Sequence, residues 1–302
     1  MGDGLGPVGL YSRTAGFDPP VSRLCRGNGY LMKFTESQIQ KLMEFGDEIR
    51  DDDFVSAEER EKEFSKAFSK LTSKNDATIE KIISDPDRHV LPKLEAELSE
   101  ALRKNGFIEV RTPLMISKAS LEKMTVTKDS SLYRQVFSID EKRCLRPMLA
   151  PNLYFVMRKL RDKTKGPVRI FEIGSCFRKE SRSTSHLEEF TMLNLVELGP
   201  EGEPTERLKE LISVIMGTVG LRYETVTECS EVYKETIDVE VGGVEVASGA
   251  VGPHVLDEAH DIHEPWCGVG FGMERLLMEM MKKSNAKKVG RSLVYLNGAK
   301  ID

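Results

Sequence analysis

Apolar side chains recur at helical spacing in the first part of the chain. Thr35 precedes such a stripe, and with Gln38 three positions later it has the pattern of a capping box. Ser56 with Glu59 repeats this pattern before a second stripe. The stripes that predict three successive helices comprise Ile39, Leu42, Met43 and Ile49, then Phe64, Ala67, Phe68 and Leu71, and last Ile79, Ile82 and Ile83. We therefore expect a small helical segment over residues 32–87.

The remaining residues, 88–302, mix helical and strand periods. Helical stripes start after His89, at Pro151 and near Leu208, and Gly106 closes the first of them. The segment FIEVRTP, before the second of these helices, has the pattern of a strand. The pair VFSID and RCLRP that follows it is typical of a hairpin.

Two antiparallel strand pairs are predicted further along the chain. Val168–Gly174 is a short apolar run, and Glu189–Leu198 alternates between two faces. One of those faces holds Phe190, Met192, Asn194, Val196 and Leu198. In the second pair, Gly242 and Gly243 can take the positive φ angles of a tight turn between IDVEV and VEVASGAVG. Antiparallel pairing follows for both.

The first of these hairpins carries polar groups at its tip. Arg178 follows the first strand, and His186 with Glu188 opens the second after a loop rich in Ser and Thr. Two interpretations are open from these residues, a solvated charged tip or a site for a bound triphosphate. Asn194 favours binding, because an unpaired amide on a buried strand face costs roughly 1–3 kcal/mol. It needs either a core partner or a ligand.

A glycine-rich segment, WCGVGFGMERLLMEMM, has the pattern of a strand followed by a helix. It places Gly268, Gly270 and Gly272 on one face of a strand before a helix that begins near Met273. Three glycines on one face allow close approach by a flat ligand. The spacing is not that of a dinucleotide fingerprint, and the sequence contains no GK[ST] phosphate loop.

Composition limits the class of protein. The chain has 302 residues, 39% of them hydrophobic, which is enough for a substantial core. No apolar run approaches the roughly 20 residues of a membrane helix or the core of a signal peptide, so we expect a cytoplasmic protein with no membrane partner. The five cysteines are far apart and form no CxxC pair, which is typical of free thiols.

Charge is unevenly spread around a net value of −5. Residues 44–63 are acidic, whereas basic side chains gather between Lys282 and Lys300, which we interpret as a solvated helix face. Residues 1–31 are rich in Gly and Pro and show neither the helical nor the strand period of apolar residues. We therefore predict that they are disordered, and Met32 is a candidate start of the protein.

Three motifs occur in an order that resembles the class II aminoacyl-tRNA synthetases. They are an early helix with a strand ending at Pro113, the FRKE…HLEEF hairpin and the GFGMER strand-to-helix turn. Six segments are similar in sequence to the pyrrolysyl-tRNA synthetase family, in the variant without a separate N-terminal tRNA-binding domain. They are LRPMLAPNLY, IFEIGSCFRKES, HLEEFTMLNL, VYKETIDV, AVGP and GFGMERLL. The resemblance runs from about His89 to the C-terminus. It implies an α+β fold with an antiparallel sheet flanked by helices, and a homodimer formed through the first motif.

The resemblance also implies a reaction. ATP and pyrrolysine, or a related N-acyl-lysine, form an aminoacyl-adenylate, and the aminoacyl group passes to an amber-decoding tRNA, tRNA(Pyl). Arg178 and Arg275 match the catalytic arginines of the family; a fixed guanidinium suits the negative charge that gathers at the attacked α-phosphorus. The other ATP-binding positions that it implies are Glu180, His186, Leu187, Phe190, Glu245 and Ser248, the last two also as Mg²⁺ ligands.

The two implied Mg²⁺ ligands have an odd spacing. A regular strand would point Glu245 and Ser248 to opposite faces. A bulge near Ser248–Gly249 would bring them to the same face. Without the resemblance, Glu245 is an ordinary solvated strand carboxylate.

The amino-acid pocket implied by the resemblance is mostly apolar, with Tyr233 as a lid. Without the resemblance, each apolar member is an ordinary core residue. Met157, Val196 and Ala250 depart from the residues of the best-known members of the family. The full set is Ala150, Leu153, Tyr154, Met157, Asn194, Val196, Tyr233, Ala250, Trp266 and Gly268.

Other interpretations compete with this one. His254, His260 and His263 could suggest a metal site, but no fourth ligand accompanies them, and structural roles are favoured. A phenylalanyl- or phosphoseryl-type synthetase is an alternative, although a phosphoserine pocket would need a cationic cluster that the alternating strand does not offer. A non-catalytic paralogue that binds an amino acid or a tRNA is a third possibility.

Overall fold

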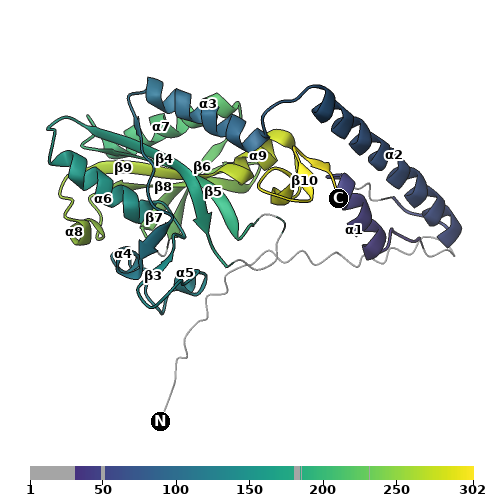
Figure 1. The fold of residues 1–302 in the computed structure, drawn as a ribbon, viewed down its shortest axis with the longest axis horizontal. Helices are drawn as coiled ribbons and strands as arrows, with labels where there is room; N and C mark the ends of the chain where they lie inside the picture. The colour runs from purple at the N-terminus through teal and green to yellow at the C-terminus, as the bar shows by residue number, and fades with distance from the viewer. Residues whose placement is uncertain (1–30, 49–51, 180–183, 185, 231) are drawn as a thin grey trace, which may run out of the picture.

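A seven-stranded sheet forms the centre of the computed structural model, which describes residues 31–48, 52–179, 184, 186–230 and 232–302 (Figure 1). The strand order is β1-β4-β5-β9-β8-β7-β6. Every adjacent pair is antiparallel except β1 with β4, which is parallel. The predicted α+β fold is therefore confirmed, with a mixed rather than purely antiparallel sheet.

The elements follow one another along the chain in the order shown in Figure 1. Their bounds are α1 (Glu36–Phe45), α2 (Ala57–Ser84), α3 (Val90–Lys104), β1 (Ile108–Glu109), β2 (Met115–Ser117), α4 (Lys118–Glu122), α5 (Ser131–Arg134), β3 (Arg143–Leu145), α6 (Ala150–Arg161), β4 (Val168–Phe177), β5 (Glu189–Leu198), α7 (Pro204–Val219), β6 (Glu224–Ser230), β7 (Lys234–Val241), β8 (Val244–Gly252), α8 (Asp257–His260), β9 (Trp266–Gly272), α9 (Met273–Met281), η1 (Ala286–Lys288), β10 (Tyr295–Leu296) and β11 (Ala299–Lys300).

Both predicted hairpins are present in the sheet. β4 and β5 pair over their full length, from Val168 opposite Leu198 to Phe177 opposite Glu189. Gly242 and Gly243, with φ of 58° and 81°, form the turn between β7 and β8. Both angles lie in the left-handed region that glycine adopts without a steric cost.

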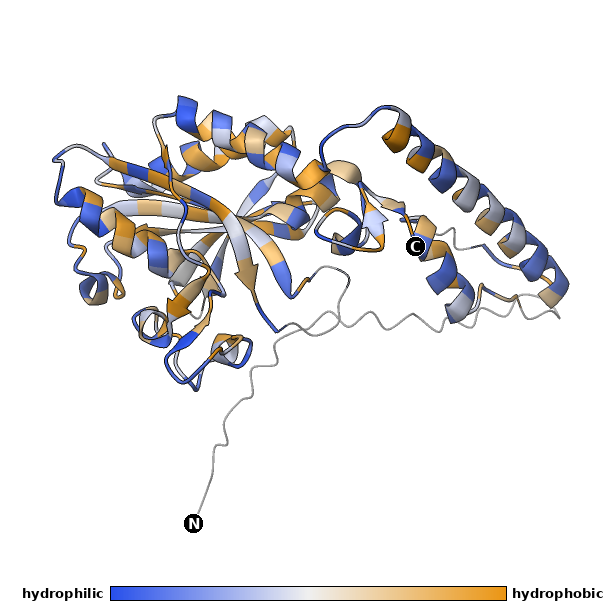
Figure 2. Ribbon diagram, in the orientation of Figure 1, coloured by the Kyte–Doolittle hydropathy of each residue, from blue (hydrophilic) through white to orange (hydrophobic). Residues whose placement is uncertain are grey.

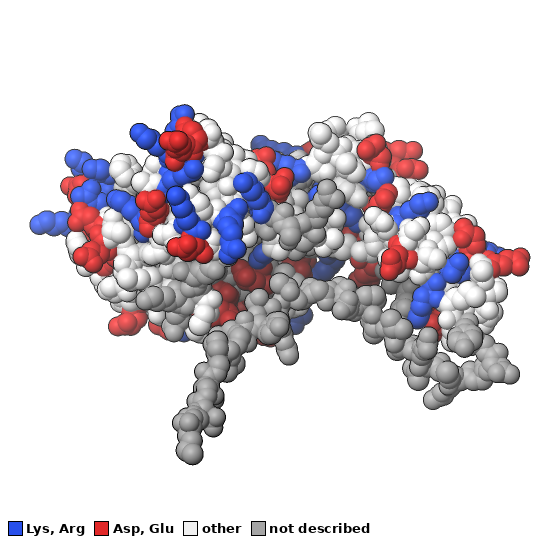
Figure 3. All heavy atoms as spheres, turned by 90° about the horizontal axis from the view of Figure 1, so that it is seen from below, with Lys and Arg blue, Asp and Glu red and all other residues white. Residues whose placement is uncertain are grey.

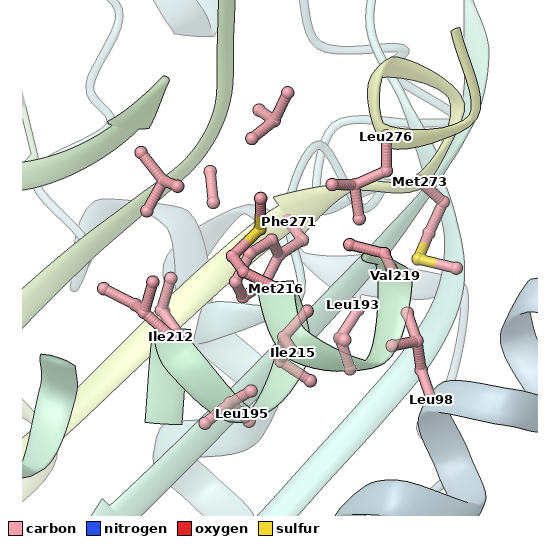
Figure 4. Packing of buried hydrophobic residues seen from close by; sticks show 14 of the residues in the cluster. Leu98, Leu193, Leu195, Ile212, Ile215, Met216, Val219, Phe271, Met273 and Leu276 are labelled. Atoms are coloured by element: carbon pink, nitrogen blue, oxygen red, sulfur yellow. The ribbon is translucent and has the colours of Figure 1, made fainter. Parts of the chain in front are cut away.

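The two faces of the sheet are covered by different helices. On one face α3, α7 and α9 enclose a core that includes Leu98, Ile215 and Phe271 (Figure 4). On the other face α6 packs against β4 and β5, and its cluster includes Val196 and Leu198. The alternation of β5 thus directs its odd residues into the first core and its even residues toward α6, as the sequence predicts.

The N-terminal helices differ in part from the prediction. α1 has the complete capping box, but it ends at Phe45, and Ile49 lies outside the described residues. α2 is one helix of 28 residues, so the separate third helix was wrong. Ser56 accepts the Glu59 N–H, while the Glu59 carboxylate accepts the Val55 N–H instead of closing a second box. Figure 2 shows α2 as hydrophilic over much of its length, in agreement with Asn75 being its one buried residue.

The basic C-terminal tail is not the solvated helix face that we expected. Lys288 is buried, and its Nζ donates to Met43 O (3.0 Å), Gly46 O (2.6 Å) and Asp47 Oδ1 (2.9 Å). A cation beside the last carbonyls of α1 complements the helix dipole. Asn75 of α2 exchanges two hydrogen bonds with the backbone of Lys300 in β11. The tail therefore attaches both N-terminal helices to the larger unit.

Several strand predictions were only partly right. FIEVRTP contributes just the two residues of β1. The expected hairpin of VFSID and RCLRP is reduced to a bridge between Ser138 and Cys144, because β3 pairs with β2 instead. β6, at the far edge of the sheet, was not predicted at all.

Other sequence expectations concern cysteines, membranes and the N-terminus. Cys144, Cys176, Cys229 and Cys267 are free thiols. Among the helices that the structure describes, none is long and apolar enough to cross a membrane. The disorder predicted for residues 1–31 falls almost entirely outside the described residues. On the face drawn in Figure 3, acidic and basic side chains are interspersed.

Candidate active site

A cavity of ≈ 530 Å³ opens on the face of the sheet that α6 covers in part. Its floor is formed by β5, β8 and β9. Gly268, Gly270 and Gly272 lie on that floor, where they pair with Val196, Asn194 and Met192 of β5, respectively. A Cβ on Gly270 would lie 3.0 Å from Asn194 Oδ1, so the missing side chain leaves room for this amide.

Arg178 lies at the end of β4, as predicted, and lines the cavity. Its Nε donates a hydrogen bond to Pro147 O (2.9 Å), and its guanidinium lies 5.2 Å from the centre of the Phe190 ring. A carbonyl and an aromatic face hold the guanidinium on two sides. This arrangement fixes a positive charge at the wall of the cavity.

Arg275 lies in the first turn of α9 and meets residues from two other elements. Its Nη1 donates to Glu245 O (3.0 Å), and its Nη2 lies 3.1 Å from His186 Nε2. The Glu245 carboxylate is 3.4 Å from Nη1. The second and third motifs predicted from the sequence therefore meet at one end of the cavity, where Glu245 of β8 joins them, because β5, β9 and β8 are consecutive in the sheet.

Glu245 and Ser248 both line the cavity despite their odd spacing. The reason is a bulge in β8, where Glu245 pairs with Glu240 and Ala247 with Val239, so that Val246 is the extra residue. The bulge therefore lies between the two residues, and our placement of it near Ser248–Gly249 was wrong. Burial raises the pKa of the Glu245 carboxyl, and Ser248 Oγ donates to Asp238 Oδ1 (2.6 Å).

The predicted ATP-binding residues that the structure describes all line this cavity, namely Arg178, His186, Leu187, Phe190, Glu245, Ser248 and Arg275. Glu180 lies outside the described residues. The cavity brings together every residue predicted for the amino-acid pocket as well: Ala150, Leu153, Tyr154, Met157, Asn194, Val196, Tyr233, Ala250, Trp266 and Gly268. Their binding roles stay predictions.

Asn194 is the polar exception on the strand face that the sequence singled out. Its Oδ1 is buried, and within the described part of the chain it has no hydrogen-bond partner. Leaving such an acceptor unpaired costs about 1–3 kcal/mol. The sequence left two explanations open, a core partner or a ligand. The described residues offer no core partner, and a ligand for this oxygen stays a prediction.

Sequence reasoning missed two buried carboxylates beside the cavity. Glu274 accepts the Thr191 N–H on both oxygens (3.0 and 2.9 Å), and burial raises its pKa to about 7. Asp257 accepts hydrogen bonds from Tyr154 and Trp266. Glu274 adjoins Arg275 in the GFGMER motif, which could have drawn attention to it, but Asp257 carries no comparable signal.

The three histidines that could have suggested a metal site each make a different contact. His254 Nε2 hydrogen bonds to Tyr233 O (2.8 Å), and His263 Nε2 to the exposed Asp261. His260 stacks on Tyr154 with ring centres 4.2 Å apart, and burial lowers its pKa to about 4. Each has a structural contact, as predicted.

The family follows from a comparison with known proteins. A family profile described as "tRNA synthetases class II core domain (F)" matches residues 74–295. The chain belongs to this class II synthetase family. The matched residues include all three motifs predicted from the sequence.

Curated relatives of this class II core match over shorter stretches. O-phosphoserine–tRNA(Cys) ligase of Methanocorpusculum labreanum is 23% identical over 174 residues, which are 54% of this chain and 33% of that protein. Lysine–tRNA ligase of Ectopseudomonas mendocina is 31% identical over 155 residues, which are 48% of this chain and 28% of that protein. The chain thus spans a third or less of the length of these two relatives.

Solved structures match over nearly their whole length. The crystal structure of pyrrolysyl-tRNA synthetase from Desulfitobacterium hafniense is 44% identical, with a TM-score of 0.83, and the match covers 89% of this chain and 98% of that one. A structure of PylSc, a pyrrolysyl tRNA synthetase of the same organism, has the same identity and coverage and a TM-score of 0.82.

Proposed function

We propose that this class II core activates pyrrolysine or a related N-acyl-lysine with ATP and transfers it to a cognate amber-decoding tRNA, tRNA(Pyl). The observation that carries the proposal is the buried Oδ1 of Asn194, which has no hydrogen-bond partner among the described residues. It lies in a cavity otherwise lined at that end by apolar and aromatic side chains. The likeness to the two pyrrolysyl-tRNA synthetase structures supports it.

ATP fits the other end of the cavity, where cationic groups gather. Arg178 and Arg275 offer two guanidinium groups, and Phe190 offers a ring face for the adenine. The carboxylate oxygen of the amino acid attacks the α-phosphorus, an O–P bond forms, and pyrophosphate leaves with the electrons of the broken bond. Arg178 stabilises the negative charge that develops, through positioning and electrostatics.

The donor set at Glu245 and Ser248 fits Mg²⁺. A carboxylate and a hydroxyl are hard oxygen ligands, and Mg²⁺ usually takes only one or two carboxylates besides phosphate and water oxygens. Among the described residues no group of three or more His, Cys, Asp or Glu could hold a metal. Bound by Glu245 and Ser248, Mg²⁺ would neutralise phosphate charge, and Glu245 would be deprotonated despite its raised pKa.

The amino acid is selected by one polar group in apolar surroundings. Asn194 can hydrogen bond to the acyl carbonyl on the distal nitrogen of the substrate. Free lysine would instead bring an ammonium group without a partner and leave the Asn194 amide unmatched, and both effects oppose binding. An N-acyl-lysine is thus the favoured chemical class.

The first motif supports a homodimer. Side chains on and near it are apolar yet exposed, at 56% for Ile108, 46% for Leu114, 44% for Met115 and 45% for Ile139. Such a patch is typical of an interface between subunits. Sedimentation equilibrium should give twice the chain mass, and Met115→Glu should shift it toward the single chain.

Amino-acid-dependent exchange of pyrophosphate into ATP tests the proposed activity. We expect exchange with pyrrolysine and with a long N-acyl-lysine, and none with free lysine. Binding of the N-acyl-lysine without any exchange would instead support a non-catalytic paralogue. Charging of tRNA(Pyl), measured with radiolabelled amino acid, then tests the transfer step.

A further inference from the structure

A single buried carboxylate lies behind the aromatic end of the amino-acid pocket. Asp257 begins the short helix α8 and is 4% exposed. Trp266 Nε1 lies 2.9 Å from each of its two oxygens, and the Tyr154 hydroxyl lies 3.2 Å from Oδ1. Trp266 and Tyr154 both line the cavity, whereas Asp257 does not. The carboxylate therefore acts on the pocket through these two rings.

Asp257 also organises the backbone that supports a third ring. Its Oδ2 accepts the His254 N–H at 2.6 Å. The imidazole of His254 in turn hydrogen bonds to the backbone carbonyl of Tyr233 (2.8 Å), and the two rings lie 5.6 Å apart. Tyr233 and Trp266 have ring centres 6.1 Å apart. One carboxylate thus reaches the three aromatic side chains that end the pocket.

The backbone of Gly252 lies close against the indole of Trp266. Gly252 pairs with Trp266 across β8 and β9, and a Cβ on Gly252 would lie 2.0 Å from Trp266 Nε1. Only glycine leaves space for the ring there. The Tyr154 ring meets the indole at 80° and stacks on His260. Gly252 and Tyr154 therefore restrict the orientation of the indole whose N–H meets Asp257.

The charge on Asp257 has no counter-ion within the part of the chain that the structure describes. Its hydrogen-bond partners are neutral N–H and O–H groups. The nearby His260 is neutral at pH 7, because burial lowers its pKa. A buried carboxylate without a cation weakens the folded state. A contribution to stability therefore does not explain why a carboxylate is buried at Asp257.

We propose that Asp257 is a positioning residue for substrate specificity: it orients Trp266 and Tyr154 so that the closed end of the pocket fits the ring of a ring-bearing N-acyl group. This inference rests on the proposed function, since it concerns the distal part of an N-acyl-lysine. A small acyl group, such as acetyl, does not reach these rings and depends on them little.

The test compares Asp257→Asn with the parent and with Asp261→Asn, an exposed matched control just after α8. Pyrophosphate exchange gives kcat/KM for a cyclopentyloxycarbonyl-lysine and for acetyl-lysine. We expect Asp257→Asn to lower the ratio of kcat/KM for cyclopentyloxycarbonyl-lysine to kcat/KM for acetyl-lysine about tenfold, with KM for ATP unchanged within about twofold. Asp261→Asn should keep the parental ratio. An equal loss for both substrates, or an unchanged ratio, would overturn the proposal.

Trp266 is the only tryptophan in the sequence, so its fluorescence reports on this contact directly. The ligand-free emission maximum should shift in Asp257→Asn and stay at the parental value in Asp261→Asn. This measurement needs no catalysis, so it separates failure of the positioning role from failure of the proposed function, which would show as absent exchange in the parent.

If Asp257→Asn does not fold, Trp266→Phe removes the N–H donor and keeps an aromatic ring. The same fall in the substrate ratio is expected for it. A folded Trp266→Phe variant with the parental ratio would contradict a role for the Asp257 contact.

Discussion

Arg146 Nη1 and Glu172 Oε1 lie 2.7 Å apart, and both residues are only 1% exposed. The pair joins the first motif to the sheet, because Thr112 donates to both Glu172 oxygens and accepts from Arg146. Pro147, the residue after Arg146, accepts the hydrogen bond from Arg178 Nε through its carbonyl oxygen. A buried ion pair thus connects the expected dimer segment with the wall of the ATP site.

Breaking this ion pair should strongly destabilise the fold. Glu172→Gln leaves the Arg146 charge buried without a partner, which costs about 3–5 kcal/mol. Urea unfolding followed by circular dichroism measures it. Glu100→Gln is the matched control: its ion pair with Lys104 is exposed, so the change should stay within about 0.5 kcal/mol. Equal effects of the two substitutions would refute the role of burial.

Arg178→Ala should abolish adenylate formation and leave the fold intact. The guanidinium is partly exposed at the cavity wall, and its loss removes charge stabilisation at the reacting phosphate, worth about 10²–10³ in rate. Pyrophosphate exchange and the melting temperature are the measurements. Lys282→Ala, at an exposed residue just after α9, should behave as the parent. Exchange at the parental rate in Arg178→Ala would remove Arg178 from the mechanism.

Glu274 should make stability depend on pH between about 4.5 and 7. Burial raises its pKa from 4.5 to about 7, so in this window the folded protein binds more protons than the unfolded one. The contribution of Glu274 to stability is therefore full below pH 4.5 and falls as pH rises through 7, by on the order of 3 kcal/mol.

The comparison of Glu274→Gln with the parent isolates this contribution. The neutral amide does not titrate, so the free energy of unfolding of the parent, relative to the variant, should be lower at pH 8 than at pH 5. Urea unfolding at both pH values measures the difference. Glu279→Gln, further along α9, should follow the parent at each pH. A constant difference between parent and Glu274→Gln would exclude the buried charge as its source.

The elements with strong local patterns were predictable from the sequence. The period of α7 and the alternation of β5 depend on burial of one face, and the Gly242–Gly243 turn depends on backbone conformation. Lys288 was not predictable as a buried residue, because its three oxygen partners lie about 240 positions away in the chain. Long-range pairing also explains the loss of the expected hairpin at β3.

The candidate site shows the same division. Its residues were implied by the resemblance to the synthetase family, and the sheet order brings those that the structure describes together at one cavity. The bulge at Val246 was needed to place Glu245 and Ser248 on one face, but its position is set by pairing with β7. Asp257 was missed, since only the packing of three distant aromatic residues reveals it.

Deleting residues 1–31 should leave aminoacylation within about twofold of the parent. The first backbone contact within the described residues joins Met32 to Phe54, and the deleted stretch has no apolar stripe with which to dock. Deleting residues 1–47 is the contrasting variant. It removes the three oxygen partners of Lys288, so the melting temperature should fall. A large loss of tRNA charging by the shorter deletion would contradict the prediction.

Asn194→Ala should change which amino acids the pocket accepts. The variant loses the only hydrogen bond proposed for the acyl carbonyl, so kcat/KM for the N-acyl-lysine should fall by the equivalent of ~1–3 kcal/mol. It also opens volume beside Gly270, whose missing side chain already leaves the floor open. A substituted phenylalanine should therefore become a better substrate.

Met192→Ala provides the matched control for this switch. Met192 lines the same cavity from the same face of β5, so its truncation adds volume while the Asn194 amide stays. It should admit the aromatic substrate to some extent and keep most of the activity on the N-acyl-lysine. The deciding quantity is the ratio of kcat/KM for the two substrates. If Asn194→Ala keeps the parental ratio, or only matches Met192→Ala, then Asn194 contributes shape alone, and its unpaired oxygen does not select the acyl group.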